Sequence, residues 1–184
     1  MKFKVTLRDI ARIAIFAAVL ALLGLPGAIN LPGGVPITAQ TLGVMLAGAI
    51  LGSWRGAASV LLFEVLVALG FPLLSGGHGG LAVFAGPTAG YLYGWIVGAW
   101  VIGAIVNAAK AKPGVLRLVL GLVLGGIVVV YALGIPVLAA SYGMSLGAAA
   151  ASNLIFLIGD SIKVAVSAIL VLALYRAYPK AFAN

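Results

Sequence analysis

Two opposite charges lie close together in an otherwise apolar stretch near the end of the chain. Asp160 and Lys163 are three residues apart, so their side chains share one helix face, with Asn153 and Ser167 one heptad to either side of Asp160. A charge at the centre of a membrane helix costs about 2.5–3.5 kcal/mol on insertion scales, so such a pair must face protein or water. The pair either ties helices together or anchors a small polar solute, and we favour the second interpretation.

Two further ionisable residues stand alone. Glu64 falls in the middle of an apolar segment, where a carboxyl group serves as a proton relay, contacts a ligand, or stays protonated and bonds to a neighbouring helix. The sequence leaves these three roles open. His78 lies in a glycine-rich segment with no second histidine or cysteine in the chain, so we expect no metal site there, and either contact with the solute or simple exposure in the loop.

Motifs for nucleotide chemistry are missing from the sequence. No G-x-x-x-x-G-K-[ST] motif occurs, so we expect no cofactor and no binding of ATP by this chain. The segment 77–82 nearly fits G-x-G-x-x-G/A, but no βαβ pattern surrounds it. There is no cysteine, and no convincing pair of nucleophile and base, so the sequence does not indicate an enzyme.

The elements that position these residues must lie in lipid. Of 184 residues, 64% are hydrophobic and 8% charged, which leaves too little polar surface for a soluble domain. The mean hydropathy is +1.27. The net charge of +8 comes from scattered basic residues without interleaved aromatics, so nucleic acid is not an expected partner. The composition predicts an all-α integral membrane protein.

Apolar runs broken by glycine, proline and charge predict six transmembrane helices in a single domain that covers residues 1–184. The expected spans are residues 9–24, 38–52, 56–70, 87–109, 114–133 and 152–175. The second and third are short for a bilayer. No internal repeat is evident, so the sequence lacks the usual trace of an inverted-repeat transporter.

Basic residues fall on alternate connections between these spans. Ten of the eleven Lys and Arg residues lie at the start of the first span or after the second, fourth or sixth. The connections 25–37, 71–86 and 134–151 contain none. By the positive-inside rule, both termini are cytoplasmic and the protein lies in the cell membrane. The three uncharged connections are long and apolar, so we expect them to cap a solute pocket on the outer side.

Small residues recur at four-residue spacing, which lets helix backbones approach closely in lipid. Such stripes are Gly90, Gly94 and Gly98, Gly48 and Gly52, and Ala14 and Ala18. We expect the stripe of three glycines to pack inside the bundle. For Ala14 and Ala18, which lie beside a second stripe of Ala17 and Ala21, an external docking face and an internal contact remain equally open.

Three segments carry a resemblance to a known family. They are PITAQTLGVMLAGAILG (residues 36–52), SGGHGGLAVFAGPTAGYLYG (residues 75–94) and GDSIK (residues 159–163). In this order and spacing they resemble the BioY family, the biotin-specific S components of energy-coupling-factor transporters. The middle segment is the most specific. Ala89 departs from the glycine that members often carry, and Glu64 has no counterpart that we recognise.

The resemblance implies a six-helix S component with a biotin pocket that opens outward beneath the first and third outer connections. It implies biotin contacts from Asp160 and Lys163 and docking through Ala14 and Ala18 to a transmembrane coupling subunit bound to two ATPases. The expected ligand-binding set takes Asp160, Lys163, Tyr91, Thr88, Phe84, His78 and Gln40 from the quoted segments and adds Asn153, one heptad before Asp160. Tyr91, Phe84 and Trp95 are candidates for the apolar wall.

The functional hypothesis is therefore high-affinity capture of biotin by the membrane subunit of an ATP-driven importer. Two alternatives remain at this stage. In the first, the chain would act alone as a proton-coupled vitamin transporter that uses Glu64. In the second, it would be an S component for another vitamin, since an Asp and Lys pair suits many small amphipathic solutes.

Overall fold

The computed structural model describes residues 5–27, 38–108 and 114–178 of the chain. Every helix or strand assigned in these ranges is a helix, which confirms the all-α prediction. The elements are α1 (Leu7–Leu22), α2 (Gln40–Leu51), α3 (Ser53–Ala68), η1 (Leu81–Phe84), α4 (Ala89–Val106), α5 (Val115–Val123), η2 (Leu124–Val129), α6 (Val130–Tyr142), α7 (Leu146–Asn153) and α8 (Phe156–Ala177). Of these, η1 is a 3₁₀-helix and η2 is a π-helix.

Three helices are long and apolar enough to cross a membrane. They are α4, the continuous unit of α5, η2 and α6 over residues Val115–Tyr142, and α8. The remaining long helices are shorter, with 16 residues in α1 and α3 and 12 in α2. Together with the apolar composition, these helices make the chain a multi-pass membrane protein.

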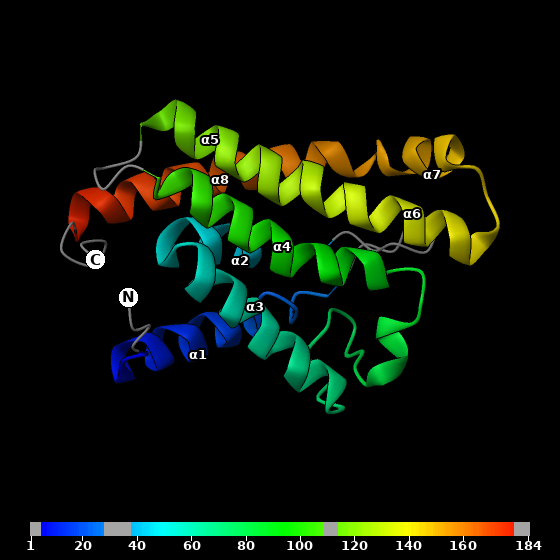
Figure 1. Cartoon of the computed structure of the whole chain (residues 1–184), viewed down its shortest axis with the longest axis horizontal. Coiled ribbons are helices and arrows are strands. Elements are labelled where there is room, and N and C mark those ends of the chain that lie inside the picture. Colours follow the sequence, from blue (N-terminus) through cyan, green and yellow to red (C-terminus); the bar gives the residue numbers. More distant parts are fainter. Residues whose placement is uncertain (1–4, 28–37, 109–113, 179–184) are drawn as a thin grey trace.

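The helix α4 lies in the middle of the bundle, between α3 on one side and the α5 to α6 unit on the other (Figure 1). The glycine stripe on α4 makes this position possible. A Cβ atom on Gly94 would lie 2.9 Å from the Cα of Val130, and one on Gly98 would lie 2.5 Å from the carbonyl oxygen of Gly125. Only glycine lets the two backbones come this close, so this stripe packs internally, as expected.

The fifth predicted helix is longer than the sequence indicated. Its expected end was residue 133, but the helix continues through Pro136 to Tyr142, and α7 follows almost at once. The expected outer connection 134–151 is therefore mostly helical. Proline is tolerated inside membrane helices because neighbouring groups satisfy the freed backbone, so Pro136 was a poor signal for a helix end. The helix ends instead at Gly143, whose φ is 62°.

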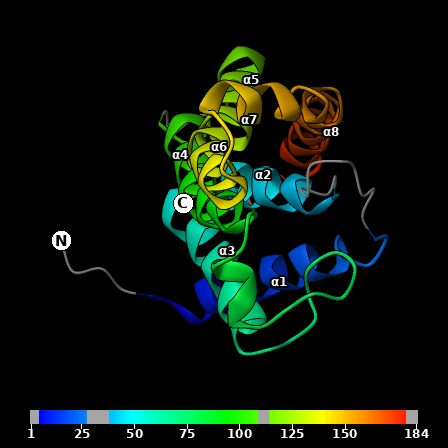
Figure 2. The ribbon, with the colours of Figure 1, turned by 90° about the vertical axis from the view of Figure 1, so that its right-hand side faces the viewer.

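The helix ends gather at two opposite ends of the molecule (Figure 1), and Figure 2 views the bundle along its length from one of these ends. At one end, on the left in Figure 1, α1, α3 and α5 begin and α8 ends. The described arginines all belong to these termini: Arg8, Arg12, Arg55, Arg117 and Arg176. The remaining basic residues of the predicted inner connections, and residues 28–37 of the first outer connection, lie outside the described residues.

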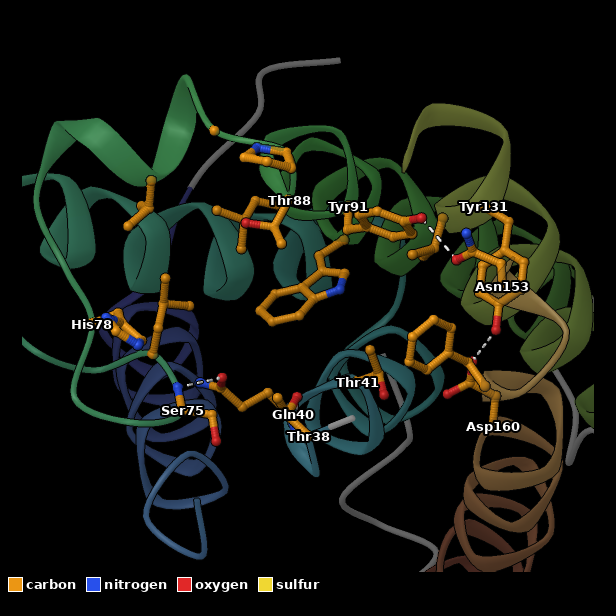
Figure 3. Close-up of a pocket in the computed structure, with 18 of the residues that line it drawn as sticks. Thr38, Gln40, Thr41, Ser75, His78, Thr88, Tyr91, Tyr131, Asn153 and Asp160 are labelled. Carbon is orange, nitrogen blue, oxygen red and sulfur yellow. Dashed lines mark hydrogen bonds between the residues drawn. The ribbon is translucent and has the colours of Figure 1, made fainter. Parts of the chain in front are cut away.

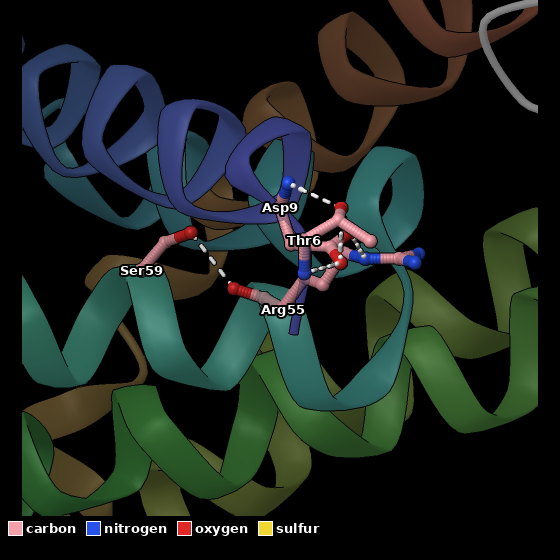
Figure 4. A network of polar contacts seen from close by, with 4 residues as sticks. All are labelled: Thr6, Asp9, Arg55 and Ser59. Carbon is pink, nitrogen blue, oxygen red and sulfur yellow. Dashed lines mark hydrogen bonds and ion pairs between the residues drawn. The ribbon is translucent and has the colours of Figure 1, made fainter. Parts of the chain in front are cut away.

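A polar network that the sequence did not suggest fastens α1 to α3 at this end (Figure 4). The Nε of Arg55 donates to Oδ1 of Asp9 over 2.6 Å. Oδ2 of Asp9 accepts from the backbone N–H of Thr6 at 2.9 Å and from its hydroxyl at 2.7 Å. The Thr6 hydroxyl in turn accepts from the backbone N–H of Asp9, which completes a capping box. The buried carboxylate thus begins α1 and attaches it to α3.

The close approach of α4 and α6 generates a stability prediction. Gly94→Ala places a methyl group against the backbone at Val130, and such overpacking costs about 1–3 kcal/mol. We expect the midpoint of thermal unfolding in detergent to fall by about 2–4 °C for each kcal/mol lost. Gly147→Ala is the matched control, because no atom lies within 4 Å of its added Cβ. Equal midpoints for the two variants would contradict the packing argument.

Candidate functional site

A cavity of about 450 Å³ opens in the half of the molecule opposite the arginines. Its walls come from the first turn of α2, the segment between α3 and α4, the first half of α4, the η2 to α6 junction, and the start of α8 (Figure 3). The lining residues are Thr38, Gln40, Thr41, Leu74, Ser75, His78, Ala82, Val83, Gly86, Pro87, Thr88, Tyr91, Leu92, Trp95, Gly126, Val130, Tyr131, Asn153, Phe156, Asp160 and Lys163. The volume suits a small organic solute.

The Asp160–Lys163 pair belongs to a network that joins three helices. The Lys163 ammonium donates to Oδ1 of Asp160 at 3.0 Å and to the hydroxyl of Thr41 on α2 at 2.7 Å. The hydroxyl of Tyr131 on α6 donates to Oδ2 of Asp160 at 2.6 Å. Both charged side chains are largely buried, with 9% and 15% of the Asp160 and Lys163 side chains exposed. Each charge is therefore balanced within the protein while still facing the cavity.

This network leaves hydrogen-bonding capacity for a ligand. A carboxylate offers about four acceptor positions, and the Asp160 carboxylate uses two of them for Lys163 and Tyr131. An ammonium has three N–H donors, and that of Lys163 uses two. A solute that carries both N–H groups and a carbonyl or carboxylate oxygen matches the remaining acceptors and donor.

A second polar pair forms the wall where α4 meets α7. The hydroxyl of Tyr91 donates to Oδ1 of Asn153 at 2.7 Å, and Nδ2 of Asn153 donates to the carbonyl of Ala149 at 2.8 Å. The Tyr91 ring lies directly against Gly134, where a Cβ would collide with it. Because residue 134 is glycine, the Tyr91 ring fits between α4 and α6, and Tyr91 lines the cavity.

The opposite wall is built from Gln40 and the segment that follows α3. Oε1 of Gln40 accepts from the backbone N–H of Ser75 at 3.1 Å (Figure 3). His78 lies further along this segment, in a tight turn in which the backbone N–H of Leu74 donates to the His78 carbonyl. The apolar surface between the polar groups includes Trp95, whose ring lies 6.4 Å from that of Phe63.

Seven of the eight ligand-binding residues predicted from the sequence line this cavity: Asp160, Lys163, Tyr91, Thr88, His78, Gln40 and Asn153. Phe84 does not. Its carbonyl accepts from the Tyr93 hydroxyl at 2.8 Å and its ring lies 6.2 Å from the Tyr93 ring, because η1 presents Ala82 and Val83 to the cavity instead.

The stripe drawn through Asn153, Asp160 and Ser167 is not one continuous helical face. Ser167 lies on the helix of Asp160 but outside the cavity, with its hydroxyl 3.7 Å from the sulfur of Met45. Asn153 belongs to α7 and not to the helix of Asp160, because a turn at Leu154 and Ile155 separates α7 from α8. Asn153 reaches the site across the bundle instead of along one helical stripe.

The sequence reasoning missed Tyr131, Thr41 and Ser75. Tyr131 lies in a long apolar run, where nothing in the sequence distinguishes it from other aromatic residues of membrane helices. The structure shows that its hydroxyl donates to Asp160. A signal did exist for Thr41, which follows Gln40 inside one of the recognised motifs.

Glu64 lies away from the cavity. Its side chain on α3 is 4% exposed, its Oε1 has no hydrogen-bond partner, and it is not a lining residue. The structure therefore gives no support to a ligand contact by Glu64. In the described ranges, no group of three His, Asp or Glu side chains is placed to hold a metal ion.

The helical membrane bundle and its charged end cavity define a membrane-embedded solute-binding protein. The chain belongs to the BioY family, which it matches over residues 1–180. This confirms the resemblance seen in the sequence. BioY is a family of transporters and not of enzymes, and a stand-alone proton-coupled transporter is not favoured.

Several relatives cover nearly the whole chain. The biotin transporter BioY of Rhodobacter capsulatus is 47% identical over 183 residues, which cover 95% of this chain and 96% of that protein. The biotin transporter BioY of Rhizobium etli is 48% identical over 182 residues, which cover 94% and 95%. The crystal structure of the S-component for biotin from an ECF-type ABC transporter superimposes with a TM-score of 0.87 at 29% identity, covering 94% of this chain and 95% of that one.

The ion pair generates a prediction about stability. Asp160→Asn leaves the Lys163 ammonium without its counter-ion, and Lys163→Met does the same to the carboxylate, so each single change lowers the free energy of unfolding. We expect the double variant to lose less than the sum of the single variants, by about 0.5–3 kcal/mol. Thermal unfolding of the four proteins in detergent measures this difference.

The control cycle pairs Asp160→Asn with Arg176→Met, which removes a cation from the last turn of the same helix. These two changes should add without coupling, because the two residues lie more than four helical turns apart. If the losses of unfolding free energy in Asp160→Asn and Lys163→Met also add without coupling, the two residues do not stabilise the protein as a pair.

Proposed function

We propose that this chain captures biotin at the outer face of the cell membrane and is the S component of an ATP-driven energy-coupling-factor importer. The observation that carries the proposal is the Asp160–Lys163 pair, held inside an apolar bundle and turned into a cavity of about 450 Å³. Membership of the BioY family and the likeness to an S-component for biotin support the same substrate.

Biotin fits the chemistry of this cavity. Its bicycle joins a ureido ring, with two N–H donors and a carbonyl, to an apolar thiophane ring, and its valerate chain ends in a carboxylate. The free acceptors of Asp160 receive N–H groups, and the free donor of Lys163 pairs with an oxygen of the solute. Leu92, Trp95 and Val130 supply apolar surface for the bicycle. We assign further contacts to Tyr91, Thr88, His78 and Asn153, which line the same space.

Transport energy comes from partners in this proposal. We assign ATP hydrolysis to two ATPase subunits that act through a transmembrane coupling subunit, with no cofactor on this chain. The docking face is the stripe of Ala14 and Ala18 on α1. Both alanines are exposed, whereas Ala17 beside them is buried, so the small residues leave a flat outer surface for another helix.

We further propose six membrane crossings within one domain over residues 1–184, with both termini in the cytoplasm. The crossings are α1, α2, α3, α4, the α5 to α6 unit, and α8. Their ends alternate between the two ends of the molecule, and the arginines at helix termini share one end, which supports an inner position for that end. The segment between α3 and α4 covers part of the cavity at the other end, as an outer cap requires.

Direct binding tests the substrate. Isothermal titration of biotin into the protein in detergent should give a tight complex. We expect Asp160→Asn and Lys163→Met each to raise the dissociation constant for biotin by about 10- to 100-fold, because each variant loses a charge-assisted hydrogen bond worth about 1.5–3 kcal/mol. Glu64→Gln is the matched control, since this buried acid lies outside the cavity. Unchanged affinity in both site variants, or no binding by the wild type, would refute the assignment.

Topology can be tested separately, because the chain contains no cysteine. Tyr142→Cys and Val115→Cys introduce single thiols at exposed positions near opposite ends of the α5 to α6 unit. In intact cells, a membrane-impermeant maleimide should label Tyr142→Cys and should reach Val115→Cys only after lysis. The reverse pattern would place the termini outside, and labelling of both before lysis would remove this crossing.

A further inference from the structure

The segment at residues 73–80, between α3 and α4, is called the wall below. One of its sides lines the cavity and the other faces α1. Leu74 lines the biotin cavity and also a second, apolar groove of about 570 Å³. This groove is lined by Ala18, Ala21, Leu22, Gly24, Leu25, Gly27, Pro72, Leu73, Leu74, Gly76 and Gly77. Ala18, which belongs to the proposed docking face, therefore stands across the groove from a thin wall whose other side faces the solute.

Gln40 fastens this wall to α1. Its Nε2 donates to the carbonyls of Leu20 on α1, at 3.2 Å, and Leu73 in the wall, at 3.1 Å. Its Oε1 accepts from the N–H of Ser75, and the Ser75 hydroxyl donates to the carbonyl of Gly24 at 3.3 Å. The Gln40 side chain is 1% exposed, and both amide protons have backbone acceptors. Most of its bonding capacity thus goes to the protein.

The end of α1 and the wall are closely packed around Gln40. A Cβ on Gly24 would lie 2.7 Å from the Leu73 carbonyl oxygen and 3.0 Å from Nε2 of Gln40. The end of α1, the wall and the Gln40 amide are therefore in direct contact. Because a packed interface shifts as a unit, a displacement of Gln40 moves the end of α1 with it.

The neighbouring residue links Gln40 to the ion pair. Thr41 follows Gln40 in the first turn of α2, and its hydroxyl accepts from the Lys163 ammonium. Two cavity residues in the described ranges hydrogen-bond to this part of the chain through their side chains, Gln40 to Leu20 within α1 and Ser75 to Gly24 just past its end. The first turn of α2 thus joins the charged site, through Thr41, to the helix that carries the docking face, through Gln40.

We propose that Gln40 is a positioning residue that couples occupation of the cavity to the placement of α1. A solute oxygen that pairs with the free donor of the Lys163 ammonium draws the ammonium toward the solute and so alters its bond to the Thr41 hydroxyl, which shifts the first turn of α2. Gln40 passes this shift to Leu20 on α1 and to the wall at Leu73 and Ser75. The inference rests on the proposed function for the identity of the solute, and it adds that docking and biotin binding are thermodynamically linked.

Hydrogen–deuterium exchange of the full chain in detergent, with and without biotin, tests this coupling. In the wild type, biotin should slow exchange in α8 around residues 156–164, in the wall at 73–80, and in the last turn of α1 at 19–25. We expect about a tenfold slowing in α1, the change that a tenfold shift of a local opening equilibrium gives. In Gln40→Met, at a biotin concentration that saturates this variant in its own titration, the slowing in α1 should fall below about twofold, read against the slowing that biotin causes in α8 of the same variant.

A second variant and a control make the test specific. Thr41→Val leaves the three bonds of Gln40 intact but removes the link to Lys163, so it should also abolish the α1 response. Asn107→Leu removes an amide hydrogen bond at the far end of α4 and should keep the full response. A merely structural role for Gln40 would raise basal exchange without removing the change caused by biotin.

The outcomes separate the inference from the proposed function. If biotin slows exchange in α8 but not in the last turn of wild-type α1, the coupling is wrong and biotin binding stands. A full α1 response in Gln40→Met, or in Thr41→Val should Gln40→Met not fold, also overturns it. If biotin changes exchange nowhere in the wild type, the proposed substrate itself fails.

Discussion

The structure depends on one constraint: polar groups inside an apolar bundle must find their partners within the protein. The Asp160–Lys163 pair satisfies this constraint by recruiting Tyr131 from α6 and Thr41 from α2. Three helices far apart in the sequence are thereby held around one point. The same bonds that neutralise the charges also hold them at the surface of a cavity.

The charges are also divided between the two ends of the molecule. At one end, arginines lie at helix termini, and one of them attaches α1 to α3 through Asp9. Toward the other end, the cavity contains a balanced ion pair and otherwise mostly uncharged groups. The helix α1 is thus held by polar contacts near both of its ends, with Arg55 at the first and Gln40 at the second. Its exposed alanines, Ala14 and Ala18, lie between these attachments.

Much of this arrangement is visible in the sequence because lipid imposes simple rules. Hydropathy predicts an all-helical membrane protein, and the i, i+3 spacing identifies Asp160 and Lys163 as a pair. Hydropathy does not show which residues meet across the bundle, so Tyr131 and the Asp9–Arg55 pair went unrecognised. The predicted end of the fifth span at residue 133 was wrong, because a packed membrane helix tolerates a proline such as Pro136. Phe84 was assigned to the cavity by its place in a motif, but the turn of η1 directs it elsewhere.

The π-helical segment η2 determines which way Tyr131 points. A π-helical stretch holds a residue more than the α-helix it interrupts, and each α-helical residue accounts for about 100° of rotation. If residues Leu124–Val129 formed an α-helix with none removed, every residue after them would be turned by about 100°, and the Tyr131 hydroxyl would point away from the Asp160 carboxylate. The wide turn of η2 therefore sets how α6 is rotated relative to α5, and a hydropathy profile, which records only how apolar a stretch is, does not detect it.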